Sequence, residues 1–427
     1  MNKGLSRDLF WNTAGSLLYA LSSMVLAFFV MRTAGAEDGG IFGFGFSTFG
    51  QQMFIVAYFG IRPFQITDVK NEYSFGEYVR ARIISSLIAV LGAFLFLGFM
   101  ALSGRYSPYK GAVIMLLALC KITDGFADVF ESECQRQGKL YLGGKALFMR
   151  TLLMMAGLMA GLLISGSLLI GALTALFSEI AGLLFFNVRL FKEGFPKEDM
   201  SLEPGKIKGI FRDTALLFLS VFLDFYIFSS VKYAIDLCLT DEVSGIFNIL
   251  FMPTSFVYLV ANFIIKPFMT MLASAFELGE KKRFMGICRK IELATAGLIL
   301  AAFGAALLLG GLVLRLGELI LGAGYSGSLY NNRYSFAVII LGGGFYALAN
   351  FYYYILVIMR RQKSIFAVYL CTAAAALFAS YFAVSGHGMT GAAICYCLLM
   401  LALLLSFAGI SAYELLRGDR FSHKEGR

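Results

Sequence analysis

Charged residues, histidine and proline are scarce in this sequence of 427 residues. Only 15% of the residues are charged, and the chain contains two histidines and six prolines. Soluble domains carry charge at about a quarter of their positions. A soluble fold of this size could not cover the apolar surface that remains. The few prolines and the lack of low-complexity stretches also argue against a disordered chain.

The residue patterns of enzyme active sites are missing as well. His387 and His423 are the two histidines, and no group of histidine, cysteine and acidic residues has metal-ligand spacing. The sequence contains no recognisable Ser-His-Asp set and no glycine-rich phosphate-binding loop. We therefore expect a protein that is not an enzyme, with no catalytic residue, no metal and no cofactor.

Long hydrophobic runs dominate what is present. Hydrophobic residues make up 59% of the chain, and the mean hydropathy is +0.76. The runs are about 20 residues long, which is the length of a helix that crosses ~30 Å of hydrocarbon. Apolar and polar residues do not alternate in these runs as they do in the strands of a β-barrel. The spans are therefore expected to be helices, which satisfy their own backbone hydrogen bonds in lipid. The sequence predicts an all-α integral membrane protein with about twelve spans at 10–31, 40–61, 83–103, 111–130, 147–165, 168–188, 214–236, 244–265, 291–313, 334–358, 365–385 and 392–413.

The distribution of lysine and arginine predicts the orientation. With a cytoplasmic N-terminus, five of the 36 basic residues fall on the outer side and two inside spans, which leaves 29 on cytoplasmic segments. Both termini are therefore expected in the cytoplasm. Basic loops that face anionic lipid account for the net charge of +9, so no nucleic acid partner is expected. The outer residues are Arg32, Arg105, Lys110, Arg315 and Arg333, and those inside spans are Lys121 and Lys232.

Weak sequence matches recur at shifts of about 204 to 220 residues, which indicates an internal duplication. For example, Arg7 and Asp8 align with Arg212 and Asp213. Each half would contain six spans, so both halves would insert in the same orientation. The predicted organisation is an N-terminal six-helix bundle at 1–190, a cytoplasmic linker at 191–213, and a C-terminal six-helix bundle with a short cytoplasmic tail at 214–427.

Two parallel six-helix bundles around a central cavity are typical of secondary transporters that work by alternating access. Charges within the spans are informative because each costs about 2.5–3.5 kcal/mol at a helix centre on insertion scales. Two spans carry such charges along one helical stripe. They are Lys121, Asp124, Asp128 and Glu131 in and after 111–130, and Asp224, Lys232 and Asp236 in 214–236.

These charges allow two interpretations, and the sequence leaves both open. In the first, Lys121 pairs with Asp124 and Lys232 pairs with Asp236, which only stabilises the fold. In the second, Arg32, Lys121 and Lys232 line the cavity and bind an anionic head group. Under this interpretation the carboxylates would carry a proton or a sodium ion. Those carboxylates are Asp124, Asp128, Asp224 and Asp236.

Two segments resemble the polysaccharide transporter family of the multidrug/oligosaccharidyl-lipid/polysaccharide flippase superfamily. The segment FWNTAGSLLYALSSMVLAFFVMRTAGAEDGGIFGFGFS carries an early Asn12, an outer Arg32 and an acidic turn followed by Gly-x-Phe. The segment VKYAIDLCLTDEVSGIFNILFMP contains Lys232 and Asp236 in the closest match. The resemblance covers nearly the whole chain, and Arg32 and Lys232 match positions of the family.

This resemblance implies a Wzx-like flippase that moves an undecaprenyl-diphosphate-linked oligosaccharide repeat unit from the inner to the outer leaflet of a bacterial cytoplasmic membrane. Such a flippase serves the synthesis of capsule, exopolysaccharide or the O-antigen of lipopolysaccharide. Its partners would be membrane lipids, the lipid-linked glycan, and a polysaccharide polymerase or other assembly proteins, with an ion gradient (H⁺ or Na⁺) as the energy source. The alternative is an ion-coupled multidrug or cation antiporter of the same superfamily.

Overall fold

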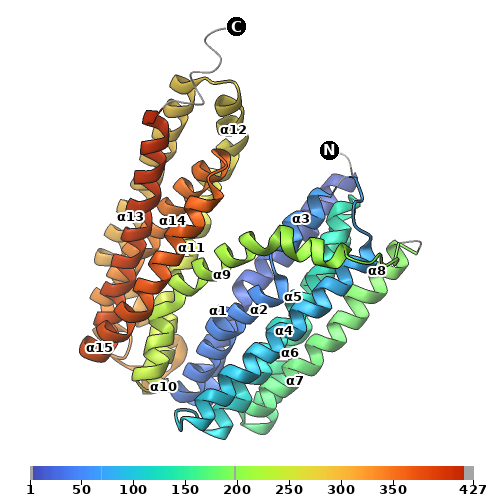
Figure 1. Cartoon of the computed structure of the whole chain (residues 1–427). Helices are drawn as coiled ribbons and strands as arrows, with labels where there is room; N and C mark the ends of the chain where they lie inside the picture. The colour runs from blue at the N-terminus through green and yellow to red at the C-terminus, as the bar shows by residue number, and fades with distance from the viewer. Residues whose placement is uncertain (1–2, 69, 197–198, 418–427) are drawn as a thin grey trace. The chain divides into compact units, whose positions relative to one another are not determined.

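A computed structural model describes residues 3–68, 70–196 and 199–417, and it confirms the all-α prediction (Figure 1). No β-strand occurs within these ranges. The α-helices are α1 (Lys3–Phe44), α2 (Gly50–Tyr58), α3 (Ile61–Thr67), α4 (Phe75–Leu102), α5 (Pro108–Arg136), α6 (Leu140–Ser165), α7 (Leu168–Gly182), α8 (Arg189–Gly194), α9 (Lys206–Cys238), α10 (Asp241–Phe251), α11 (Pro253–Ile265), α12 (Met269–Glu277), α13 (Lys281–Leu321), α14 (Arg333–Ile358) and α15 (Gln362–Arg417).

Nine continuous helical stretches in the described residues are long and apolar enough to cross a membrane. Two of them contain a sharp turn, because Gly35 in α1 has a φ of 93° and Gly388 in α15 has a φ of 56°. Only glycine adopts such values readily. Each of these stretches is therefore a helical hairpin with two crossings. With α5, whose charges lower its hydropathy, the described residues contain twelve crossings, as the sequence predicts.

The chain divides into two compact units. Unit 1 comprises Met1–Phe222 and Thr240–Gly245, and unit 2 comprises Leu223–Leu239 and Ile246–Arg427. The boundary predicted at 191–213 stays a prediction, as does the duplication. Several residues to which the sequence analysis assigned a side or a segment lie outside the described residues. They are Lys197 and Glu198 of the expected linker, and Arg420, His423, Lys424 and Arg427 of the expected tail.

In unit 1, α5 lies in the middle of the bundle. It packs against α2, α4, α6 and α7, while α1 packs along α6 (Figure 1). Two π-helical segments, Gly45–Phe49 and Leu183–Val188, interrupt the helices that face α5. Such segments occur often at functional sites. Ser107 caps the N-terminus of α5 by accepting a hydrogen bond from the Lys110 amide, and Pro108 occupies the first helical position.

In unit 2, α14 is the central helix and packs against α11, α13 and both arms of α15. Pro253 begins α11 directly after the end of α10, because proline cannot donate the hydrogen bond that a continuous helix needs. Gly342 lies so close to the ring of Tyr396 that a Cβ atom there would approach the ring to 2.8 Å. The glycines of α14 therefore permit close helix packing.

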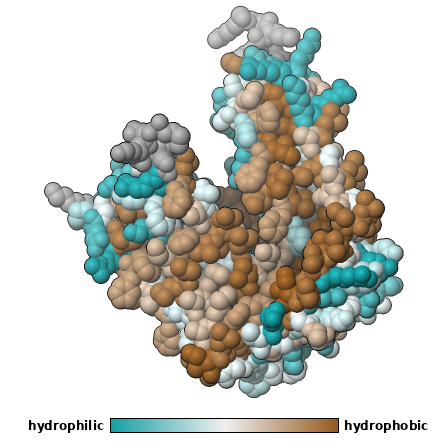
Figure 2. Space-filling view, turned by 180° about the vertical axis from the view of Figure 1, so that it is seen from behind, coloured by the Kyte–Doolittle hydropathy of each residue, from teal (hydrophilic) through white to brown (hydrophobic). Residues whose placement is uncertain are grey.

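The outward surface is strongly hydrophobic, as a lipid-facing surface must be. Figure 2 shows hydrophobic side chains over wide areas of the visible face, with hydrophilic side chains gathered in separate areas. Leu102, Ile164 and Leu308 each expose more than four-fifths of their area. Soluble monomers rarely expose apolar patches larger than a few hundred Å², so these side chains fit contact with hydrocarbon.

Candidate functional site: buried charges in each unit

The charged stripe predicted on 111–130 lies on α5, and its members are buried in unit 1. Lys121, Asp124, Asp128 and Glu131 expose 4–6% of their area. The Lys121 ammonium lies 3.4 Å from Oδ2 of Asp124 and donates a hydrogen bond to the Tyr19 hydroxyl at 3.3 Å. It also lies 4.1 Å from the ring centroid of Phe46, in the first π-helical segment. The pairing of Lys121 with Asp124 is therefore present.

Arg150 of α6 is the centre of this group and contacts three carboxylates. Its Nη2 donates to Oδ1 of Asp124 at 2.8 Å, its Nη1 donates to Oε1 of Glu131 at 3.0 Å, and its Nε lies 2.7 Å from Oε1 of Glu179. Asn187, in the second π-helical segment, accepts from Arg150 and donates to Glu131. We call Lys121, Asp124, Glu131, Arg150 and Glu179 the Arg150 cluster.

Asp128 belongs to a neighbouring arrangement on the same helix. Arg62 and Arg82 both pair with its carboxylate, Arg82 through Nη2 at 2.5 Å. Arg82 also donates to the carbonyl of Tyr58 at the end of α2, where helical carbonyls lack partners. Arg82 therefore caps the C-terminal end of α2 and neutralises Asp128 of α5.

Arg62, Arg82 and Arg150 are among the 29 basic residues that the sequence analysis assigned to cytoplasmic segments, and the side on which they lie stays a prediction. Arg82 is fully buried and Arg150 exposes 1% of its area, because each lies inside unit 1 against acids of α5. Hydropathy alone places the three arginines at span ends, since the acids of α5 that bind them are 19 to 66 residues away in sequence. The sequence feature that points to these buried arginines is the excess of acidic over basic residues in and just after 111–130.

Arg32 lies on the surface near the turn of α1 at Gly35, and its side chain is exposed. It belongs to unit 1, whereas Lys232 belongs to unit 2. Substrate binding by Arg32 stays a prediction.

Lys232 of α9 has a different environment from Lys121. It exposes 8% of its area, and its ammonium lies 4.2 Å from the ring centroid of Phe251. Within the described part of the chain it makes no ion pair, and the pair expected with Asp236 is not formed. Asp236 is also buried, at 6% exposure. A cation held only by an aromatic ring inside a membrane protein is suited to bind an anion.

Asp224 is another of the carboxylates that the sequence analysis singled out, and it lies in unit 2. It accepts a hydrogen bond from the Tyr346 hydroxyl at 2.8 Å. No cationic side chain among the described residues pairs with it. The ring of Tyr346 stacks on Tyr258 with 5.3 Å between centroids. The carboxylate therefore lies among aromatic rings, a setting that suits an organic cation.

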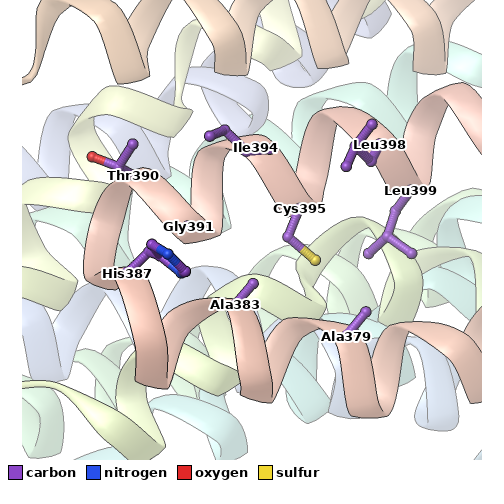
Figure 3. Close-up of a pocket in the computed structure, with 9 residues that line it drawn as sticks. All are labelled: Ala379, Ala383, His387, Thr390, Gly391, Ile394, Cys395, Leu398 and Leu399. Atoms are coloured by element: carbon purple, nitrogen blue, oxygen red, sulfur yellow. The ribbon is translucent and has the colours of Figure 1, made fainter.

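A cavity of about 440 Å³ lies between the two arms of α15 (Figure 3). In the close-up, His387 and Thr390 lie at one end, and the side chains of Ala383, Ile394 and Leu399 continue from them along both arms. No acidic side chain, lysine or arginine lines it. Because lipid is as apolar as this cavity, an alkyl chain would gain no hydrophobic free energy by moving from lipid into it. The cavity contains none of the charged groups described above.

The fold is that of the MATE transporters of the MOP superfamily. An inward-facing MATE family multidrug resistance transporter matches with a TM-score of 0.73 at 12% identity, over 94% of this chain and 96% of its own. The MATE multidrug transporter DinF-BH, in a ligand complex, matches at 0.66 and 15% identity, over 99% and 97%. A MOP superfamily transporter from Pyrococcus furiosus matches at 0.59 and 12% identity, over 97% and 96%.

No protein-family model matches the sequence, and no curated protein matches it. The likeness to solved structures, at 12–15% identity, shows the fold alone. Membership of the superfamily that the sequence resembles, and of its polysaccharide transporter family, stays a prediction.

Proposed function

We propose that this protein is an ion-coupled secondary transporter that works by alternating access. The observation that carries this proposal is the fold, which matches MATE transporters over nearly the full length of both chains. Buried, membrane-embedded charges in each unit support it, because charges at this depth are retained mainly where they serve binding or ion movement. Two cargo classes have support, each from a different observation.

The first cargo class is an organic cation, exported by a multidrug antiporter. The comparisons back this class better, since most of the matching structures are MATE transporters and several are described as multidrug transporters. Asp224 is the residue that would bind the cation, because it is a carboxylate with one hydroxyl donor and aromatic neighbours but no cationic partner in the described chain.

The second cargo class is an undecaprenyl-diphosphate-linked oligosaccharide, flipped from the inner to the outer leaflet for cell-surface polysaccharide synthesis. The buried, unpaired ammonium of Lys232 favours an anionic head group. The Pyrococcus furiosus transporter offers a precedent, since the reverse polarity of its binding pocket suggests a different function. A polymerase would then be a partner, and the bacterial cytoplasmic membrane the location, with both termini in the cytoplasm.

One pair of substitutions separates the two cargo classes. Purified protein in proteoliposomes is tested for transport of the cationic dye ethidium and, separately, for flipping of an undecaprenyl-diphosphate-linked oligosaccharide. For an antiporter, Asp224→Asn should abolish dye transport while Lys232→Gln retains it. For a flippase, Lys232→Gln should abolish flipping, and the wild-type protein should not move the dye. Failure to move either cargo would contradict both proposals.

A further inference from the structure

Two arginines lie against one tyrosine ring at the end of unit 2 where α13 connects to α14. The guanidinium carbons of Arg315, on α13, and Arg333, the first residue of α14, lie 4.2 and 4.9 Å from the ring centroid of Tyr330. Arg333 also donates a hydrogen bond to the Tyr334 hydroxyl at 3.3 Å. Neither arginine makes an ion pair within the described residues. Two like charges around one ring repel each other, so an anion beside that ring is favoured.

The connection between α13 and α14 holds Tyr330 in this place. Oε1 of the buried Glu318 accepts hydrogen bonds from the backbone amides of Leu329 at 2.9 Å and of Tyr330 at 2.7 Å. Gly311 leaves room for the ring, since a Cβ atom there would lie 2.9 Å from Cε2 of Tyr330. Glu318 therefore fixes the position of the ring, and it makes no ion pair with Arg315, which lies one turn earlier on the same helix.

The surroundings of Arg315 are those of a surface in contact with lipid. Leu312, Leu316 and Leu319 lie on the same helix and expose 59%, 52% and 76% of their area, and Tyr334 exposes 66%. Arginine and tyrosine side chains are suited to the depth at which hydrocarbon gives way to head groups, because each has an apolar body and a polar tip. The anion that a bilayer supplies at this depth is the phosphate of a lipid.

The two arginines are also unusual for the side on which the sequence places them. Five basic residues are expected on the outer side, and Arg315 and Arg333 are two of these five. The attraction of basic loops to the anionic cytoplasmic leaflet accounts for the other side of the membrane only. A specific partner for these two arginines is therefore needed where they lie.

We propose that Arg315 and Arg333 bind the phosphate group of an anionic membrane lipid beside the ring of Tyr330, while the exposed leucines of α13 contact its acyl chains. The planar guanidinium group matches phosphate oxygens with two parallel donors. Phosphatidylglycerol fits two arginines better than phosphatidylcholine does, because its head group carries no cation of its own. The site does not depend on the proposed function, since neither arginine is among the residues assigned to cargo.

The test counts bound lipids by native mass spectrometry of the full-length protein in a neutral detergent, titrated with phosphatidylglycerol or with phosphatidylcholine. The wild-type protein should bind one phosphatidylglycerol molecule more tightly than any phosphatidylcholine. Arg315→Gln and Arg333→Gln should each weaken the binding of this molecule about fivefold, the effect expected for one arginine near a head group. The double variant should bind the two lipids equally.

Arg105→Gln is the matched control. Arg105 is an exposed arginine that the sequence also places on the outer side, but it belongs to unit 1. The control should bind phosphatidylglycerol as the wild-type protein does. An equal loss in Arg105→Gln would show that net charge attracts the lipid, and a double variant that binds like the wild-type protein would overturn the proposal.

Two further measurements identify what the site recognises. Tyr330→Leu keeps both charges but removes the ring around which they gather, so it should weaken phosphatidylglycerol binding as much as either arginine variant does. Wild-type binding in Tyr330→Leu would show that the ring does not organise the site. An excess of inorganic phosphate should leave the lipid bound, because free phosphate lacks the acyl chains. Displacement of the lipid by phosphate would show that the site takes the free anion, which would contradict the assignment to a lipid.

Discussion

Arg150→Met should be the most damaging single substitution in unit 1, because it removes the group that neutralises three buried carboxylates. Removing one partner of a buried ion pair costs about 3–5 kcal/mol. Here Arg150 contacts Asp124, Glu131 and Glu179 at 2.7–3.0 Å while exposing 1% of its area. Met fills a similar volume, so lost packing contributes little. We expect a loss of at least ~3 kcal/mol in the free energy of unfolding.

The assay is an SDS titration of the purified protein, with the folded fraction followed by tyrosine and tryptophan fluorescence. The control is Arg189→Met, since Arg189 pairs with Glu193 on the surface with side-chain exposures of 69% and 59%. Exposed pairs contribute about 0–1 kcal/mol. Equal unfolding midpoints for Arg150→Met and Arg189→Met would refute the reasoning.

A combined variant tests the cause of the loss. Arg150→Met with Glu131→Gln and Glu179→Gln leaves only Asp124 ionised, and Lys121 still pairs with it at 3.4 Å. If unpaired charge causes the damage, this triple variant should be more stable than Arg150→Met alone, although it carries more substitutions. A triple variant that is less stable would point to lost packing instead.

Three further substitutions test single contacts. Lys232→Met should leave the unfolding midpoint unchanged or raise it, since a buried ammonium without an ion pair costs desolvation; a large loss of stability would contradict the environment described. Tyr346→Phe should cost about 1.5–3 kcal/mol in the same titration, as it removes a hydrogen bond donated to the Asp224 carboxylate; an unchanged midpoint would exclude that bond. Lys110→Glu should destabilise unit 1 by placing a second carboxylate opposite Asp241, which Lys110 contacts at 2.6 Å, and the swap with Asp241→Lys should restore the midpoint if the ion pair is the cause.

Much of the fold follows from local sequence, since each span is a run of apolar residues long enough to cross the membrane. The turns at Gly35 and Gly388 also lie where the predicted spans leave short gaps. The pairing of Lys121 with Asp124 was equally accessible, because three residues separate neighbours on one helical face. These features need no knowledge of which helices meet.

The centre of the candidate site could not be predicted, because its residues come from helices whose contacts the sequence does not reveal. Arg150 and Glu179 lie 29 positions apart and meet because α6 and α7 pack against each other and against α5. Lys232 and Asp236 show the limit of spacing, since a separation of four residues suits an ion pair, yet the Lys232 ammonium lies over Phe251. Sequence spacing gives the face of a helix, whereas tertiary packing decides which group on that face finds a partner.

The central claim is that this protein transports its cargo at the expense of an ion gradient. The most direct measurement supplies wild-type proteoliposomes with ethidium or lipid-linked oligosaccharide under a H⁺ or a Na⁺ gradient and follows the movement of the cargo. The account predicts transport that stops when the gradients are collapsed. Transport that continues unchanged without either gradient would contradict it.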